Sequence, residues 1–497
     1  MEETAVKKTS YRKILKHSSI YIFGMILSKA VSFILLPLYT RYLTPEDYGV
    51  LGLIYMTSDV LTMLLAMGLT ASVLRFYSAE EIQENKNKVI STALIAGSIL
   101  FVGIFGILSF YAGLTSQIVF GSTDYTPHCR LMYFTMVLFA TIEVPLAYLR
   151  ASARSFEFVI INTVRLVLQL GLNIWFIVFL GQGVLGVLYS TLITFVVISA
   201  YLVFMTIKSC GFHFSFEMFK KMIVYGFPLI FAEVGAFIIT FSNRYILNAY
   251  STLTEVGLFN LGYKFGMVVT MMFLIPFHQH WAAEMFEIDK RSDKERAFAR
   301  VFTMVMGISL ILLFGVSVYV REVIKVMSNP EYLDAYKVVP IICLAYFFSG
   351  MMDYVQLGVL IKKRTKYVAY STAVAAGICL LLNFALIPYF GMYGAAGATV
   401  AAFLARFILT YIWSQKLYPL KYEWSRIIVL FFYTAVILLA SLYFSFDNAV
   451  YGFAKDTLFL AVYLVVVYLA WLNPNERQLA VQILKKPRQA FKSITGS

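Results

Sequence analysis

Long apolar runs follow one another along almost the whole chain, and they restrict it to a helical membrane fold. A membrane-spanning helix needs about 20 mostly apolar residues. Fourteen such runs lie at approximately 15–39, 47–74, 88–112, 130–149, 158–180, 184–207, 222–247, 254–279, 299–320, 337–360, 367–388, 393–415, 426–446 and 455–472. Hydrophobic residues make up 60% of the 497 positions and charged residues 14%, whereas about a quarter of a soluble domain is charged. The sequence therefore predicts an all-α polytopic membrane protein with about 14 transmembrane helices.

The loop charges predict how these helices are oriented. With the N-terminus placed inside, the cytoplasmic loops carry most of the lysines and arginines, as the positive-inside rule requires. The outer loops then hold Arg41, Arg130, Arg321, Lys325, Lys337 and Lys455. Both termini are therefore expected in the cytoplasm, and we expect no removable signal peptide. The net charge of +14 is dispersed over many short loops, which argues against nucleic acid as a partner.

One long stretch of the sequence occurs twice. Residues 143–186 match residues 353–397 after a shift of 210 positions. The coinciding landmarks are Glu143 with Asp353, Arg154 with Arg364, Asn173 with Asn383 and Gly181 with Gly391. A weaker match relates Asp47-Tyr-Gly49-Val-Leu to Glu255-Val-Gly257-Leu-Phe. Duplicated halves with an even number of spans enter the membrane in the same direction.

The repeat predicts the domain organisation. We expect two parallel six-helix bundles, at 1–215 and 216–421, related by a pseudo-two-fold axis along the membrane normal. Two further helices, within 422–473, and a basic cytoplasmic tail, 474–497, follow the second bundle.

Ionisable side chains recur inside the apolar runs. A charge facing lipid costs at least ~3 kcal/mol, so such residues are candidates for a functional site. We predict that the cations and one amide bind the substrate: Lys29, Arg165, Gln169, Arg244, Lys264 and Arg406. The acids are Asp59, Glu143, Glu233 and Asp353, and we interpret them as ion-coupling or charge-balancing residues. The set is typical of an anion-accepting vestibule between two bundles.

A simpler interpretation of the same charges stays open. The acids could only neutralise the cations as packing ion pairs, and Arg244, near a helix end, could extend to the membrane surface. Asn162, Arg165, Gln169 and Asn173 follow one another at steps of three or four residues, so they share one helix face.

The sequence contains no pattern that indicates catalysis. The five histidines are scattered, and His278 and His280 are two residues apart, so they do not share a helix face. The four cysteines lack metal or redox spacing, and no nucleotide-binding motif is present. We therefore expect no enzyme activity, no metal and no cofactor.

Motifs in the first, second and seventh spans resemble a known family. The first reads Leu36-Pro37-Leu-Tyr-Thr-Arg41-Tyr-Leu-Thr-Pro45-Glu-Asp-Tyr-Gly49, and the second Met67-Gly68-Leu-Thr-Ala-Ser-Val-Leu-Arg75. The seventh contains Tyr225-Gly226-Phe-Pro228 and Asn243-Arg244-Tyr-Ile-Leu. With the duplicated halves, they resemble the polysaccharide-transporter (Wzx-like O-antigen or capsule flippase) branch of the multidrug/oligosaccharidyl-lipid/polysaccharide exporter superfamily. The likeness covers nearly the whole chain.

The resemblance implies a fold like that of the multidrug and toxin extruders (MATE-like) and a function. It implies a flippase of the bacterial inner membrane that moves an undecaprenyl-pyrophosphate-linked oligosaccharide to the outer leaflet by alternating access, for O-antigen, capsule or exopolysaccharide synthesis. H⁺ or Na⁺ are the candidate coupling ions, and a polysaccharide polymerase or glycosyltransferases are candidate partners. Family members often have Asp where this chain has Asn243, so Arg244 lacks that local ion-pair partner.

Three alternatives to this function stay open. They are a cation-coupled multidrug exporter of the same superfamily, a lipid II flippase, and a non-transporting scaffold of a glycan-synthesis complex.

Overall fold

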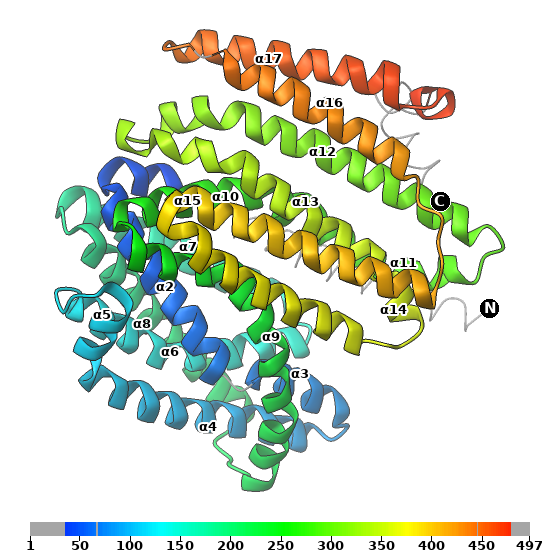
Figure 1. The fold of residues 1–497 in the computed structure, drawn as a ribbon. Helices are drawn as coiled ribbons and strands as arrows, with labels where there is room; N and C mark the ends of the chain where they lie inside the picture. Colours follow the sequence, from blue (N-terminus) through cyan, green and yellow to red (C-terminus); the bar gives the residue numbers. More distant parts are fainter. Residues whose placement is uncertain (1–34, 66–67, 445, 479–497) are drawn as a thin grey trace. The chain divides into compact units, whose positions relative to one another are not determined.

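The computed structural model describes residues 35–65, 68–444 and 446–478, and in these residues it is helical without strands (Figure 1). The helices are α2 (Pro45–Leu65), α3 (Leu69–Ala79), α4 (Gln83–Phe110), α5 (Ala112–Phe120), α6 (Thr126–Ala151), α7 (Ser155–Asn173), α8 (Gly183–Cys210), α9 (Phe216–Tyr250), α10 (Leu253–Val269), α11 (Ile275–Asp289), α12 (Lys294–Met327), α13 (Val339–Val355), α14 (Leu357–Ile361), α15 (Lys366–Leu417), α16 (Trp424–Tyr443) and α17 (Ala449–Val466). Short π-helical turns continue α7, α10 and α17, and a 3-10 segment, Pro330–Val338, precedes α13.

Ten helices of the described chain are long and apolar enough to cross a membrane, or eleven if α2 and α3 form one span bent by 43°. The predicted spans at 367–388 and 393–415 both lie in α15, which is broken at Gly391 with φ 50°. Most of the predicted span at 15–39 lies outside the described residues. The all-α polytopic class is therefore confirmed, and the total of 14 spans stays a prediction.

The chain forms two compact units. The first comprises Met1–Asn260, Met327–Tyr332 and Ala376–Ala398, and the second Leu261–Val326, Leu333–Ala375 and Thr399–Ser497. The domain boundaries predicted at 215 and 421 stay a prediction.

Helix α6 lies at the centre of the first unit because it is apolar on two faces. One face, with Val144 and Ala147, packs against α3 and α4. The other, with Ile142 and Leu149, packs against α8. A helix that is apolar on more than one stripe is buried by neighbours on more than one side, which places the α6 residue Glu143 between packed helices.

Equivalent glycines of the two sequence repeats meet inside the first unit. A Cβ atom built on Gly49 of α2 would collide with the carbonyl oxygen of Leu253 and lie 3.2 Å from the Gly257 nitrogen. A Cβ atom on Gly257 of α10 would collide with the carbonyl oxygen of Pro45 and lie 3.1 Å from the Gly49 nitrogen. This reciprocity is the signature of a two-fold contact. The weak sequence similarity between the two segments therefore corresponds to equivalent positions in the fold.

Hydrogen bonds near this crossing follow the same symmetry. Asn248 Nδ2 donates to the Val119 carbonyl at 2.8 Å, and Arg41 Nε donates to the Met327 carbonyl at 3.2 Å. The shift that relates Gly49 to Gly257 also relates Val119 to Met327. The end of the first helix in each repeat therefore contacts the end of the third helix in the other repeat.

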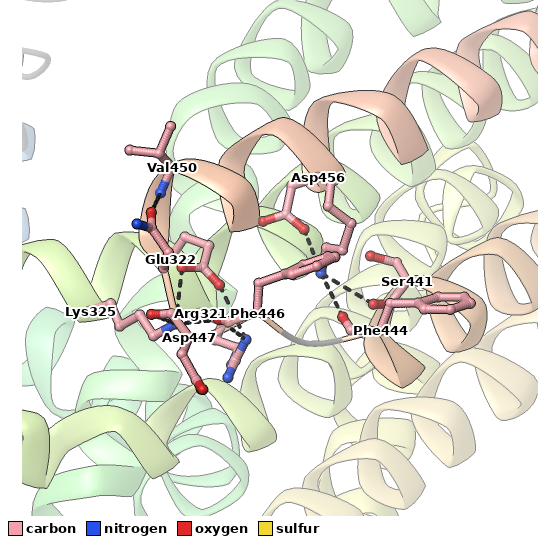
Figure 2. A network of polar contacts seen from close by, with 11 residues as sticks. Arg321, Glu322, Lys325, Ser441, Phe444, Phe446, Asp447, Val450 and Asp456 are labelled. Carbon is pink, nitrogen blue, oxygen red and sulfur yellow. Dashed lines mark hydrogen bonds and ion pairs between the residues drawn. The ribbon is translucent and has the colours of Figure 1, made fainter.

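In the second unit, a buried ionic network attaches the loop between α16 and α17 to α12 (Figure 2). The fully buried Glu322 accepts hydrogen bonds from Arg321 Nη1 at 3.3 Å and from Lys325 Nζ at 3.4 Å. Lys325 also donates to the Phe446 carbonyl at 2.7 Å. The fully buried Asp456 of α17 lies 2.8 Å from Lys455 Nζ.

Candidate functional site

A first group of candidate charges lies in the first unit. Glu143 of α6 and Arg165 of α7 are both partly buried, and their charges interact electrostatically. Arg150, at the end of α6, has a larger electrostatic effect on Glu143 than Arg165 has. The structure thus brings together two residues that the sequence singled out separately.

The second pair lies in the second unit. Asp353 of α13 interacts electrostatically with Arg406 of α15 and with His278 of α11. Within the described residues, the buried Nε atom of Arg406 has no hydrogen-bond partner. Arg406 therefore keeps a donor in the membrane-spanning region that the protein itself does not use.

The two acids are equivalent in the repeat, but their cations are not. Arg165 follows its acid on the next helix, whereas Arg406 lies on the second arm of α15, beyond Gly391. The duplication therefore preserved a carboxylate in each half, while each half acquired its cation from a different helix.

The predicted polar face of α7 contains two buried asparagines that bond to the protein and two residues that stay partly exposed. The buried Asn162 Nδ2 donates to the Phe158 carbonyl at 2.8 Å, and the buried Asn173 Nδ2 donates to Tyr39 Oη at 3.0 Å. Between them, Arg165 and Gln169 are only partly buried. Gln169 Nε2 donates to Thr191 Oγ1 of α8 at 3.3 Å.

The repeated asparagine has the same role in each half. Asn383, the counterpart of Asn173, donates from Nδ2 to Ser242 Oγ of α9 at 3.3 Å. Tyr39 and Ser242 belong to the first helix of their respective repeats. Each asparagine therefore joins the fifth helix of a repeat to its first helix.

Arg244 is buried, with a side-chain exposure of 2%. Its Nε atom donates to Asn260 Oδ1 at 2.9 Å and its Nη1 atom to Asn243 Oδ1 at 2.9 Å. The guanidinium also lies 4.9 Å from the centre of the Phe259 ring, a cation–π distance. The interpretation that Arg244 extends to the membrane surface is therefore wrong, and Asn243 replaces the missing acid with a neutral acceptor. A role in substrate binding stays a prediction.

The other four candidate residues are Lys264, Asp59, Lys29 and Glu233. Lys264 is exposed on α10. Asp59 of α2 is solvent-accessible and lines a cavity of about 170 Å³ in the first unit. Lys29 lies outside the described residues, and Glu233 lies in a part of α9 whose side chains are outside them too. The single chamber lined by all these cations stays a prediction.

Sequence reasoning missed two features of the second unit. The acids Glu322 and Asp456 stand beside cations that we interpreted as outer-loop charges, so their burial was not expected. A cavity of about 290 Å³ between α12, α13 and α16 is lined almost entirely by apolar side chains such as Leu310, Phe347 and Phe431. Such a cavity suits hydrocarbon rather than a charged headgroup.

Comparison with solved structures confirms the fold class. The structure is similar to the lipid II flippase MurJ in an inward closed conformation, with a TM-score of 0.70 and 14% identity, covering 91% of this chain and 99% of that chain. It is also similar to an inward-facing multidrug resistance MATE family transporter of the MOP superfamily, with a TM-score of 0.62 and 15% identity, covering 79% and 93% of the two chains. The chain is therefore a multi-pass membrane protein with a MATE-like fold.

Comparison of sequences identifies the family. A model described as polysaccharide biosynthesis protein matches residues 14–280, which are just over half of the 497 residues. The chain belongs to this family, which confirms the resemblance and the prediction of a transporter rather than an enzyme.

Two relatives agree with this assignment. A protein of Shigella flexneri described as an O-antigen transporter is 21% identical over 405 residues, 77% of this chain and 93% of that protein. A protein of Haloferax volcanii described as a low-salt glycan biosynthesis flippase, Agl15, is 21% identical over 220 residues, 43% of this chain and 46% of that protein. The latter match spans less than half of the Haloferax protein.

Proposed function

We propose that the protein is a flippase for an undecaprenyl-pyrophosphate-linked oligosaccharide. It moves this lipid from the inner to the outer leaflet of the bacterial cytoplasmic membrane by alternating access, and both of its termini are cytoplasmic. The observation that carries the proposal is the occurrence of two partly buried arginines on long apolar helices, Arg165 and Arg406, each in electrostatic interaction with one acid of the duplicated pair.

The chemistry of the substrate explains why such cations are needed. A pyrophosphate headgroup cannot cross hydrocarbon unaided, because its charges would lose their hydration. Arginine donors at membrane depth replace part of that hydration, because a guanidinium can bind phosphate oxygens through several N–H groups. The apolar cavity between α12, α13 and α16 suits the hydrocarbon of the lipid.

The acids have a secondary part in the proposal. Glu143 and Asp353 balance Arg165 and Arg406 when no substrate is bound, and with Asp59 and Glu233 they are the groups on which coupling to H⁺ or Na⁺ would act. In this proposal, glycosyltransferases supply the lipid-linked oligosaccharide, and a polysaccharide polymerase consumes it after transport.

Substitution of the two arginines tests the proposal. In a host that lacks the gene, Arg165→Ala and Arg406→Ala should each lower surface polysaccharide about tenfold, the effect of losing ~1.4 kcal/mol of binding. Arg165→Lys and Arg406→Lys should keep part of the activity, since the charge remains. The exposed Arg130 offers the matched control Arg130→Ala, which should not change the polysaccharide.

Surface polysaccharide is measured at equal protein abundance in the membrane. Normal amounts in both alanine variants would contradict the proposal. A reconstituted protein that moves no labelled lipid-linked oligosaccharide would favour the scaffold alternative.

A further inference from the structure

We infer that the cavity beside Asp59 is a subsite for one sugar ring of the headgroup, recognised through its hydroxyl or amino donors. This inference rests on the proposed function. The cavity lies wholly within the first unit, where α2, α6 and α8 meet, and has a volume of about 170 Å³.

Four of the six polar residues that line this cavity present acceptors: Ser58, Asp59, Thr135 and Thr191. Ser58 Oγ donates its proton to the Ile54 carbonyl at 3.0 Å, and Thr135 Oγ1 to the Leu131 carbonyl at 2.9 Å. Thr191 Oγ1 likewise donates to the Val187 carbonyl at 2.9 Å. A hydroxyl group that has given its proton to its own helix offers only lone pairs to a ligand. Together with the Asp59 carboxylate, these oxygens select a ligand that donates hydrogen bonds, and they disfavour a phosphate group.

The size of the cavity favours a sugar ring over a single ion. About 10–15 Å³ is enough to hold one water molecule, so the cavity is roughly ten times larger than a small ion requires. The rest of its wall is mainly apolar, with Met136, Phe139 and Phe195, and also contains the hydroxyl groups of Tyr55 and Thr62. A hexose ring combines hydroxyl groups at its edge with C–H groups on its faces, and a wall of acceptors and apolar groups matches both.

The position of the cavity relative to Arg165 fits a glycosyl pyrophosphate. Gln169 lies four residues after Arg165 on α7, about 6 Å along a helix. Gln169 Nε2 donates to Thr191 Oγ1, which belongs to the cavity wall. The acceptor-lined cavity and the cation are thus linked through one helical turn. In a glycosyl pyrophosphate, the sugar ring is bonded directly to a phosphate, so the ring and the anionic oxygens are also close neighbours. The subsite would therefore bind the sugar next to the pyrophosphate.

Reconstituted full-length protein tests the assignment with two probes, undecaprenyl pyrophosphate carrying a single glucose and undecaprenyl pyrophosphate without sugar. The wild type should move the glucose-bearing lipid at least about tenfold faster, as expected of a site built to hydrogen-bond its ligand. Asp59→Asn and Thr135→Val should remove most of that preference. Thr163→Val is the matched control, because Thr163 donates to the Val159 carbonyl in the same way but does not line the cavity.

Arg165→Ala separates this inference from the proposed function. It should slow both lipids and keep their ratio, because the arginine is assigned to the pyrophosphate that both probes carry. Equal rates for the two lipids in the wild type, or an unchanged ratio in Asp59→Asn, would overturn the subsite while leaving the flippase intact.

A binding measurement decides the case in which the wild type moves neither lipid. Glucose should then raise the thermal unfolding temperature of the wild type and of Thr163→Val, but not that of Asp59→Asn. NaCl and choline chloride are compared in the same measurement. If only NaCl raises the unfolding temperature, and Asp59→Asn removes this effect, the cavity binds a cation and the sugar subsite is refuted. The absence of a glucose effect in the wild type would also refute it.

Discussion

Single buried carboxylates lie beside three of the cations that depart from the positive-inside pattern. Arg321, Lys325 and Lys455 were counted as outer-loop charges, yet they lie beside the fully buried Glu322 and Asp456. The positive-inside rule counts lysines and arginines whether or not an acid lies beside them, so the predicted orientation depends on the larger number of cations in the other set of loops.

Removing the charge of Glu322 should destabilise the second unit. Glu322→Gln leaves Arg321 and Lys325 partly buried without their partner, and breaking a buried pair costs about 3–5 kcal/mol. The thermal unfolding temperature of the purified protein in detergent should fall clearly. Glu331→Gln, at an exposed position, is the control and should have little effect. Equal unfolding temperatures for the two variants would show that the network does not stabilise the fold.

At the residue scale, the sequence identified ionisable residues within apolar runs, but it could not identify the partners of each one. From the sequence alone, Arg165 was one of several possible partners for Glu143, because only the packing of α6 with α7 brings these two residues together. Arg244 shows the limit most clearly: the acceptor of its Nε atom, Asn260 Oδ1, belongs to α10 and lies near Arg244 only after α9 and α10 have packed. Hydrophobic periodicity contains no information about such neighbours.

At the scale of elements, two glycine positions define how helices cross and end. Gly181 and its counterpart Gly391 both have positive φ, 61° and 50°, where a side chain is strained. Both breaks were predicted from the limits of the apolar runs, which end at 180 and 388 and resume at 184 and 393. The close contact of Gly49 with Gly257 was not predicted, since a weak sequence match does not show which surfaces touch.

A methyl group at the helix crossing should weaken the first unit. Gly257→Ala places a Cβ atom against the backbone carbonyl of Pro45, which cannot move aside as a flexible side chain can. Overpacking of this kind costs roughly 1–3 kcal/mol. The matched control is Gly171→Ala in α7, where the space around the new Cβ atom is open, and alanine is the better helix former there by about 1 kcal/mol. Thermal unfolding should rank Gly257→Ala below the wild type and Gly171→Ala at or above it; the reverse order would disprove the tight crossing.

At the scale of the whole molecule, the two repeats touch at both ends of their helices. Arg41 donates to the Met327 carbonyl at one end, and Ser72 Oγ donates to the Met222 carbonyl at 2.9 Å at the other. The charge pattern places the contacts at the Arg41 end outside. Alternating access requires these contacts to separate when the outer side opens. Ser328 Oγ donates to Thr40 Oγ1 at 2.9 Å, so this pair joins the two repeats at that side.

A disulfide at this pair should stop transport reversibly. The double variant Thr40→Cys with Ser328→Cys should lose lipid flipping under oxidising conditions and recover it after reduction. The four native cysteines are buried, so they should interfere little. Each single variant should transport normally under both conditions, and full transport by the oxidised, cross-linked double variant would refute opening at this side.

The reciprocal crossing of Gly49 and Gly257 has a consequence for how such a chain arose. A half-length ancestor with one such glycine would have formed the same crossing with a second copy of itself. Fusion of two gene copies would then have kept an existing interface rather than created one. In the ancestral dimer, one mutation of that glycine would have changed both subunits at once. In the fused chain, each of the two glycines can change independently.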